Sequence, residues 1–592
     1  MMDSESKLSG GKLALDLEWH YKDDDPLRGK FRCGCWYSAS SGLCGTFDLS
    51  EIRQRFAVAA SLGSWEIVGH NINADLKKLV EWGVRLPDDF RIRDSLLAAR
   101  MFVPSAPTKE LKPFAREYGL FWEDKHDTEN SRELIEYCAK DTYAAWWLEN
   151  KLLQNKDEHQ KKLYDFQCEL SRAFLAVEVA GVKIDRELLE QERLRITTEL
   201  TGLVKDIPEH IVTNDNVLRA WLRNRYSEKE LHTLGTTDTG QLSINVKVLQ
   251  TLPKPNKEFR AIVRARELQD YLTLYIDRPK ELTDSRGFFF PEYKLLVAKT
   301  QRRSTTPAIQ NWPSEARKVI VSRFPGGKIL SLDFKNLEAR LFAWQAGCKK
   351  LLSALVEGGY PLVAERCFGW ERIEKTDPRY KMLKILILAV LYNMSPGMMR
   401  YQLKINHGMI VSYEEAEQQL NDFFDVFSEI YDERERRKRF AKKHGYAVSE
   451  IGARMPMQSL PDGILPPEKM QRVAKSLENK AVNYPTQNLA SYVTGCALVD
   501  VQEYLRRESG LSWGEYIADM KVSQAYPNPE KFIGFPIAEV HDELVFDVTA
   551  EGAEFLPSMI AGVMTAGRKL KELCPAFDCP IDVDTTVKEC WN

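Results

Sequence analysis

Apolar and polar positions alternate differently in the two parts of this chain. Residues 12 to about 150 carry short apolar runs, typical of strands, between amphipathic stretches that are typical of helices. Residues 156 to about 285 are mostly helical in pattern and rich in charge, and from about 290 onward strand-like segments flank a long helical region at 345–480. This order predicts an α/β domain with a mixed sheet, followed by an α+β domain.

The composition is that of a globular, intracellular protein. Its 592 residues imply several domains, and its contents of 44% hydrophobic and 29% charged residues are ordinary. A net charge of -3 gives no support to nonspecific binding of nucleic acid, although a near-neutral protein can be basic along one groove. The N-terminus lacks a signal sequence, and the longest apolar run, 385–391, is too short to cross a bilayer. We therefore expect a cytoplasmic protein without membrane association.

The first candidate site is a set of acids spread over three segments of the α/β part. Asp16 and Glu18 follow a strand-like run, and residues i and i+2 of a strand face the same side. Tyr137 and Asp141 are neighbours on one face of a predicted helix, and Asp75 follows another strand-like run. Four converging acids can hold two divalent ions, with the tyrosine orienting the attacking water. One Asp-x-Glu alone is weak evidence, but three motifs in this order favour a site over scattered surface acids.

A second pair of acids lies at the ends of apolar strands in the C-terminal part. Asp333 ends the run 329–332, and Asp542 lies beside Glu543 between two alternating apolar runs, as in a hairpin. Adjacent acids repel each other unless a cation binds there, and two ions held by such acids can catalyse phosphoryl transfer. Taken alone, the acidic turn fits a solvent-exposed loop equally well, and Glu338 fits the start of a surface helix.

Residues 381–392 predict an apolar helix with one polar stripe. Lys384, Leu388 and Tyr392 are spaced four residues apart and so lie on one side of the helix, with Lys381 near them. A stripe of cations that ends in an aromatic ring suits a triphosphate at one end and a base at the other. The alternative is a core helix whose lysines reach out to water.

These motifs, taken in order, resemble two known kinds of domain. The motifs at 16–18, 71–75 and 137–141 are similar to a proofreading 3′-5′ exonuclease domain of the DEDDy type, which has an RNase H-like mixed sheet with helices. The C-terminal part resembles a family A (Pol I-like) DNA polymerase, whose fold has the shape of a right hand with palm, fingers and thumb. DFKNLEAR is similar to its motif A, KILILAVLY to its motif B and VHDEL to its motif C. Two further motifs of that family have counterparts at 300–311 and 483–487.

The resemblance implies roles for the acids and their neighbours. In the polymerase site Asp333 and Asp542 hold two metal ions, and Glu543 supports them. Lys384 contacts the incoming triphosphate and supplies a general acid, while Glu338 with Tyr392 excludes a ribose 2′-OH. The metal ligands of the exonuclease site are Asp16, Glu18, Asp75 and Asp141, and Tyr137 assists the water there.

The resemblance also implies binding residues, two ions of Mg²⁺ or Mn²⁺ in each site, and a set of partners. The nucleotide is expected to meet Lys381, Lys384, Leu388, Tyr392, Glu338 and Arg379. The DNA is expected to meet Arg302, Arg303, Gln310, Asn311, Asn483, Gln487, His541 and Asn71. The expected partners are primer-template DNA, dNTPs and replication accessory proteins, and the enzyme itself is expected to be a monomer.

The same resemblance predicts the domain limits. The exonuclease domain covers 1–155 and the polymerase domain 156–592. Within the latter, the thumb is expected at about 186–290, the palm at about 291–345 and 485–592, and the fingers at about 346–484. No 5′-nuclease domain is expected, and that compact arrangement is typical of bacteriophage enzymes, which act in the cytoplasm of the infected host.

Two other functions fit parts of the pattern. One is a 3′-5′ exonuclease whose C-terminal region only binds DNA; the other is a noncatalytic replication scaffold. The intact pair Asp333 and Asp542, together with Lys384, argues against both.

The sequence departs from the polymerase family around the nascent base pair. Leu388 stands where the family has Phe or Tyr, Tyr380 where it has Arg, and Leu362 where it has a phosphate-contacting His. Asn393 and Asn488 replace two glycines. An additional insertion lies near 508–533.

These departures raise the hypothesis that the enzyme copies DNA containing 2-aminoadenine, as some phage polymerases of this family do. Altered groups around the nascent pair are the observation behind it. We then expect the 2-aminoadenine nucleotide to be incorporated opposite T more efficiently than dATP in steady-state assays. Equal efficiencies would remove the reason for the hypothesis.

Overall fold

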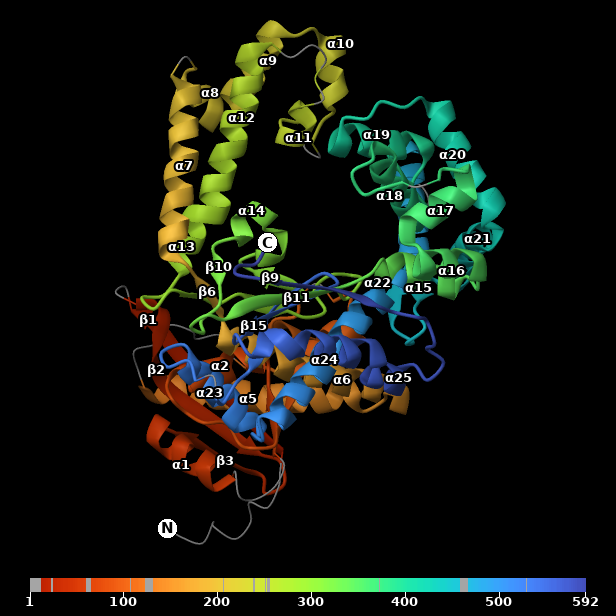
Figure 1. Cartoon of the computed structure of the whole chain (residues 1–592). Coiled ribbons are helices and arrows are strands. Elements are labelled where there is room, and N and C mark those ends of the chain that lie inside the picture. The colour runs from red at the N-terminus through yellow and green to blue at the C-terminus, as the bar shows by residue number, and fades with distance from the viewer. Residues whose placement is uncertain are drawn as a thin grey trace.

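The computed structural model describes residues 12–22, 25–59, 65–106, 108–122, 131–205, 207–237, 240–250, 252, 256–371, 373–457, 467–528 and 530–592. An α/β part precedes a larger α+β part, as predicted. Two helical arms rise from the central sheet of the larger part and give it the shape of a right hand (Figure 1). Across the described ranges, no helix combines the length and the apolar character that a membrane span requires.

The N-terminal sheet has five strands in the order β3-β2-β1-β4-β5. Its strands are β1 (Lys12–Lys22), β2 (Asp25–Ser38), β3 (Leu43–Phe47), β4 (Trp65–Gly69) and β5 (Phe90–Asp94). The first three are antiparallel neighbours, whereas β4 and β5 run parallel to β1. Parallel neighbours need crossover connections, which helices supply. Leu15, Ile67 and Ile92 bury the sheet against those helices.

Helices flank this sheet and lead into the larger part. They are α1 (Leu49–Ala59), α2 (Ile72–Glu81), α3 (Ser95–Phe102), α4 (Leu111–Glu117), α5 (Ser131–Leu153) and α6 (Glu158–Ala180). Asp157 begins α6 with a capping box, in which its carboxylate accepts from the Gln160 N–H at 2.7 Å. Because α6 is apolar on nearly every side, it runs through the interior between the two parts.

The first arm is a pair of long helices with short ones at its tip (Figure 1). Its elements are α7 (Arg186–Val204), α8 (Glu209–Thr213), α9 (Asp215–Arg225), α10 (Glu228–Leu231), η1 (His232–Leu234), α11 (Val246–Leu249), α12 (Lys257–Tyr271), η2 (Leu272–Asp277) and α13 (Arg278–Leu282). The tip has an apolar cluster of its own, in which the rings of Trp221 and Phe259 stack at 6.2 Å. The arm can therefore hold its shape independently of the sheet.

The central sheet is antiparallel, in the order β14-β15-β11-β16. Its strands are β11 (Lys328–Phe334), β14 (Gly534–Val540), β15 (Glu543–Val548) and β16 (Val583–Lys588). Helix α24 (Gly552–Ala566) packs on the sheet and α25 (Arg568–Leu573) follows it. Smaller elements around it are β6 (Val182–Ile184), β7 (Phe288–Phe289), β8 (Glu292–Lys294), β9 (Ser304–Thr306), η3 (Ile309–Asn311), α14 (Ser314–Arg317) and β10 (Ile320–Val321).

The second arm consists of the helices that follow β11 (Figure 1). They are α15 (Leu337–Gln345), α16 (Lys349–Glu357), α17 (Gly359–Phe368), α18 (Pro378–Leu391), α19 (Pro396–His407), α20 (Tyr413–Val426) and α21 (Ser428–His444). A hairpin of β12 (Tyr446–Val448) and β13 (Arg454–Pro456) precedes the 42-residue helix α22 (Pro467–Glu508). Helix α22 returns the chain from this arm to the central sheet.

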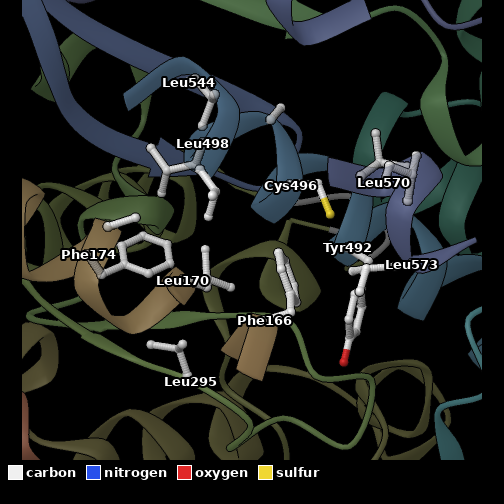
Figure 2. Packing of buried hydrophobic residues seen from close by; sticks show 14 of the residues in the cluster. Phe166, Leu170, Phe174, Leu295, Tyr492, Cys496, Leu498, Leu544, Leu570 and Leu573 are labelled. Atoms are coloured by element: carbon white, nitrogen blue, oxygen red, sulfur yellow. The ribbon is translucent and has the colours of Figure 1, made fainter. Parts of the chain in front are cut away.

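The largest apolar cluster joins α6, α22 and the central sheet (Figure 2). Phe166 of α6 stacks on Tyr492 of α22 with ring centroids 5.2 Å apart, and Phe174 stacks on Tyr293 at 4.3 Å. Leu498 and Leu544 lie in the same cluster. Since burial of large apolar side chains is the main stabilising term, the two parts of the chain share one core.

The predicted insertion forms helix α23 (Trp513–Ser523), which packs against the N-terminal part. The Trp513 N–H donates to the Asp88 carbonyl at 2.9 Å, and the Ser512 hydroxyl donates to the Asp88 carboxylate at 2.8 Å. Arg172 of α6 lies over the Trp513 ring at 4.3 Å. Helix α23 therefore packs the N-terminal part of the chain against the larger part.

A buried ion pair ties α6, α23 and β15 together. Arg323 and Asp547 are 2.8 Å apart, and their side chains are only 1% and 0% exposed. Arg323 also donates to the carbonyls of Ala180 and Gly181 at 3.0 and 2.7 Å, which satisfies the buried guanidinium. Removing one partner of such a pair leaves an uncompensated buried charge.

We predict that Asp547→Ala lowers the free energy of unfolding by about 3–5 kcal/mol, because Arg323 then loses its carboxylate. Chemical denaturation followed by circular dichroism measures it. The matched control is Glu136→Ala, whose partner Arg132 is 88% exposed, and the expected change there is within about 0.5 kcal/mol. Equal shifts for the two variants would contradict the structural role of the buried pair.

Candidate functional site

The central sheet brings the C-terminal acids to one edge. Asp333, near the end of β11, lies opposite Glu543 of β15 and opposite Asp584 of β16. Asp542 lies in the turn between β14 and β15, and its carbonyl accepts from the Phe334 N–H at 3.1 Å. The backbone register thus places the two predicted acids next to each other. Asp584 was not predicted, because only the pairing of β11 with β16 brings it there.

Crowding of these acids makes them hard to ionise. Burial, followed by repulsion from Glu338 and Asp333 and against attraction to Arg302, raises the pKa of Asp542 to about 7. Loss of surrounding water and repulsion from Glu543 and Asp584 raise the pKa of Asp333 to about 6. The Asp333 residue is itself exposed, so water screens part of that repulsion. A divalent cation would relieve the repulsion at both groups.

The donor set suits hard divalent ions. Two carboxylates with water and substrate phosphate oxygens are the usual ligands of Mg²⁺ in phosphoryl-transfer sites. In the ranges described above, no three His, Cys, Asp or Glu side chains come together as a ready-made metal cage. Asp333 and Asp542 therefore fit an ion that takes its remaining ligands from water and substrate.

Glu543 is held by side chains on all sides. Ser331 of β11 donates to Oε1, the Trp591 indole N–H donates to the same oxygen at 3.2 Å, and Arg317 lies 3.4 Å from Oε2. Its carboxylate is thus engaged in fixing the C-terminal segment against the sheet. Support of the site by Glu543 stays a prediction, and Trp591 is a partner that the sequence did not predict.

Glu338 and Tyr392, predicted as a pair, meet in the structure. The Tyr392 hydroxyl donates to Glu338 Oε2 at 3.0 Å, and Gln487 of α22 donates to the Tyr392 hydroxyl at 3.0 Å. Arg302 donates to Glu338 Oε1. Segments far apart in sequence therefore converge beside Asp542, whose pKa responds to both Glu338 and Arg302.

Helix α18 presents its predicted stripe toward the acids. Lys381 and Lys384 are exposed, and Leu388 is half-buried one turn further along. The Lys384 ammonium lowers the pKa of Asp333, so its charge acts on the acid at the sheet edge. Arg379, at the start of the helix, is instead paired with Asp377 at 2.7 Å. Asp377 also caps the helix by accepting from the Arg379 N–H at 2.8 Å.

Two tyrosines of the second arm face the same space. The rings of Tyr360 and Tyr380 lie 6.0 Å apart, and the pKa of Tyr360 is raised by burial and then by Tyr380, Glu338 and Asp542. Leu362, expected at a phosphate-contacting position, packs against the apolar cluster of the arm, as do Tyr360 and Tyr380. Tyr360 is the residue of this turn whose pKa responds to the acids.

Arg303, one of the predicted DNA contacts, is nearly buried. Its side chain is 5% exposed and is paired with Glu539, and it donates to the Ser491 carbonyl at 2.5 Å. This guanidinium therefore joins α22 to β14. Sequence reasoning missed this because Glu539 becomes its neighbour only through the fold.

The other predicted DNA contacts have mixed surroundings. Asn311 and His541 are exposed, and Asn483 is half-buried on α22. Gln310 donates to the Glu539 carbonyl at 3.2 Å. Asn71 is exposed in left-handed backbone (φ 63°) before α2, and its N–H donates to Asp94 at 3.0 Å.

The two asparagines that replace glycines are both tied to buried polar groups. Asn393, in left-handed backbone (φ 51°) after Tyr392, accepts from Arg434 of α21. Asn488 accepts from the Ser449 hydroxyl at 2.6 Å and donates to the Thr300 carbonyl at 3.2 Å. These side chains connect α18, α21 and α22 where glycine would leave no link.

The N-terminal acids also converge. Asp16 and Glu18 lie on β1, Asp75 on α2 and Asp141 on α5. Burial and then repulsion from Asp75, Asp141 and Glu18 raise the pKa of Asp16, and burial raises that of Asp75. Burial and Asp141 raise the pKa of Glu18 to about 7. The Leu17 N–H donates to Asp75 at 3.1 Å, which fixes one acid to the strand of the other two.

Two residues that sequence reasoning missed contact this second cluster. Lys112 of α4 donates to the Tyr137 hydroxyl and lies 3.8 Å from Asp141. The Trp122 indole N–H donates to Asp141 at 2.8 Å. No motif in the sequence marks either residue, since α4 and the segment after it reach the acids only in the folded protein.

The family model and the similar proteins point to the same family. Residues 186–592 match the model of DNA polymerase family A. The thermostable DNA polymerase I of Thermus caldophilus is 25% identical over 582 residues, which cover 95% of this chain and 60% of that protein. DNA polymerase I of Aquifex aeolicus is 23% identical over 583 residues, which cover 92% and 91%. The chain thus spans about 60% of the length of the Thermus caldophilus relative.

A solved structure has the same fold. It is the POL domain of Pol1 from M. smegmatis in complex with DNA primer-template and dNTP, at a TM-score of 0.77 and 20% sequence identity. The match covers 98% of this chain and 96% of that one.

We predict that Asp542→Asn stabilises the ion-free protein at neutral pH. Folding raises the pKa of this carboxyl from an ordinary 3.8 to about 7, so the folded state holds a proton that the unfolded state releases. Stability in EDTA should therefore fall as the pH rises from about 4 to about 7, and the asparagine removes that loss.

Thermal unfolding in EDTA over this pH range measures the effect. The midpoint of Asp542→Asn should exceed that of the wild type above about pH 7 and approach it near pH 4.5. The exposed Asp432, changed to Asn, serves as the control and should give no such pH-dependent difference. Equal unfolding midpoints for Asp542→Asn and the wild type at every pH would show that folding does not raise the pKa of Asp542.

Proposed function

This chain belongs to DNA polymerase family A, and from that premise we propose that it is a template-directed DNA polymerase with a 3′-5′ proofreading exonuclease. The proposal covers extension of a primer 3′-OH with dNTPs in DNA replication. The observation that carries it is the convergence of Asp333, Asp542 and the Glu338–Tyr392 pair at one sheet edge. We also propose the predicted division into an exonuclease domain at 1–155 and a polymerase domain at 156–592.

At the polymerase site Asp333 and Asp542 would hold Mg²⁺ or Mn²⁺. When bound, two such ions lower the pKa of the primer hydroxyl and neutralise the departing pyrophosphate. The primer oxygen forms a bond to the α-phosphorus while the bond from that phosphorus to the β-bridging oxygen breaks. Lys384 binds the triphosphate as a point charge and protonates the pyrophosphate.

The surrounding side chains select the substrate. Tyr392, fixed by Glu338 and Gln487, walls off the space where a ribose 2′-OH would sit. Movement of α18 toward the sheet would complete the site around a pair that fits. Leu362 and Tyr380 replace charged phosphate contacts with uncharged side chains in our proposal, so Lys381 and Lys384 supply positive charge on α18.

The N-terminal acids support proofreading. Asp16, Glu18, Asp75 and Asp141 would hold the ions there, and Tyr137 orients the water that attacks the terminal phosphodiester. Slow closure around a mismatch gives the primer end time to separate and reach this second site as a single strand. An exonuclease with a merely DNA-binding C-terminal region is not favoured, because such a protein has no use for the Lys384 and Glu338–Tyr392 arrangement.

Several finer predictions belong to this proposal. They are primer-template DNA and dNTPs as partners, accessory proteins, a monomeric state, a cytoplasmic location and a phage origin. Incorporation of 2-aminoadenine nucleotides is a prediction of the same kind.

Primer extension on matched and 3′-mismatched templates with Mg²⁺ tests the proposal. The wild type should shorten the primer without dNTPs and lengthen it with them. Asp542→Asn should lose extension by a factor of about 10³ or more and keep digestion, whereas Asp16→Asn should do the reverse. Digestion without extension in the wild type would mean that the C-terminal region only binds DNA.

A further inference from the structure

Lys112 is a buried cation inside the N-terminal acid cluster. Its side chain is 6% exposed, on a helix anchored by the fully buried Phe114 and Ala115. Burial of an ammonium group is unfavourable unless acids or hydrogen bonds compensate it. The mechanism proposed above assigns no role to this residue.

Lys112 contacts several members of the exonuclease site. Its ammonium donates to the Tyr137 hydroxyl, lies 3.5 Å from the centre of the Tyr137 ring and is 3.8 Å from an oxygen of Asp141. Its charge also lowers the pKa of Glu18. One cation therefore faces two of the acids and the tyrosine.

The direction of the first hydrogen bond is fixed by chemistry. An ammonium has three donors and no acceptor, so the Tyr137 oxygen must accept. The hydroxyl proton is then available only on the other side, where Tyr137 shares a hydrogen bond with Asp141.

We propose that Lys112 is a positioning residue for proofreading, which holds the Tyr137 hydroxyl in place as a donor directed toward Asp141 and the substrate. This inference rests on the proposed exonuclease activity. Without Lys112 the hydroxyl can turn to either side, and the water that it orients loses a fixed partner. The expected loss lies in the chemical step and leaves binding of the single strand nearly unchanged.

The experiment measures digestion of a single-stranded oligonucleotide by the full chain with Mg²⁺, at several substrate concentrations. Lys112→Met should lower kcat by about 10- to 100-fold, the usual effect of losing a residue that orients a site group, with KM changed by less than about threefold. The control is Lys140→Met, one residue from Asp141 but exposed, which removes the same charge and should digest like the wild type.

A double-mutant cycle shows whether Lys112 acts through the hydroxyl. In a Tyr137→Phe background, where the hydroxyl is absent, Lys112→Met should lower kcat by less than about threefold. A loss as large as in the wild-type background would overturn the proposal, because Lys112 would then act on the acids alone.

Primer extension reports folding in every variant. If Lys112→Met also loses extension, Lys112→Gln replaces it, and the glutamine must still lower kcat by at least about tenfold because a neutral amide orients the hydroxyl weakly. An unchanged kcat in both variants, or a loss confined to KM, overturns the proposal. Absence of digestion by the wild type itself is a different result and would refute the exonuclease function.

Discussion

Repulsion between neighbouring carboxylates is the constraint on which this molecule depends. Both acid clusters gather groups whose pKa values are raised by burial and by one another, so each cluster is unfavourable to fold in the absence of cations. The backbone imposes the crowding: the register of β11 places Asp333 between Glu543 and Asp584. The apolar core that α6 and α22 share stabilises the fold, and this stability offsets the repulsion between the acids.

Fixed cations offset part of the repulsion in each cluster. Arg302 and Lys384 lower the pKa values of the acids at the central sheet, and Lys112 lowers that of Glu18 in the N-terminal cluster. Each cation comes from an element other than those that carry the acids. The charge balance of either cluster therefore depends on the packing of other elements against a sheet. A shift of one such element changes the pKa values of the acids without any change in the strands.

The sequence alone predicted the parts of the sites that are local. Asp333 stands near a strand end, Asp542 stands in the turn between two strands, and Asp16 and Glu18 lie within β1. In all three places short-range alternation reveals the strand, and for Asp16 and Glu18 also the side that faces the site. The meeting of Glu338 with Tyr392 came from family resemblance. Asp584, Lys112 and Tyr360 escaped notice because strand pairing or helical phase alone brings them to the acids. The pairing of Arg303 with Glu539 escaped notice for the same reason, since Glu539 lies on a distant strand.

Helix α22 sets a limit on how this protein can change during evolution. At 42 residues it is about 63 Å long, and its side chains meet different partners along its whole length. Gln487 donates to Tyr392, Gln502 donates to the Ala173 carbonyl of α6 at 3.0 Å, and Asp500 pairs with Arg568 at 2.7 Å. One residue inserted or deleted turns everything beyond it by about 100°. Point substitutions leave this register intact, whereas an insertion or deletion between Gln487 and Gln502 would break at least one of these contacts.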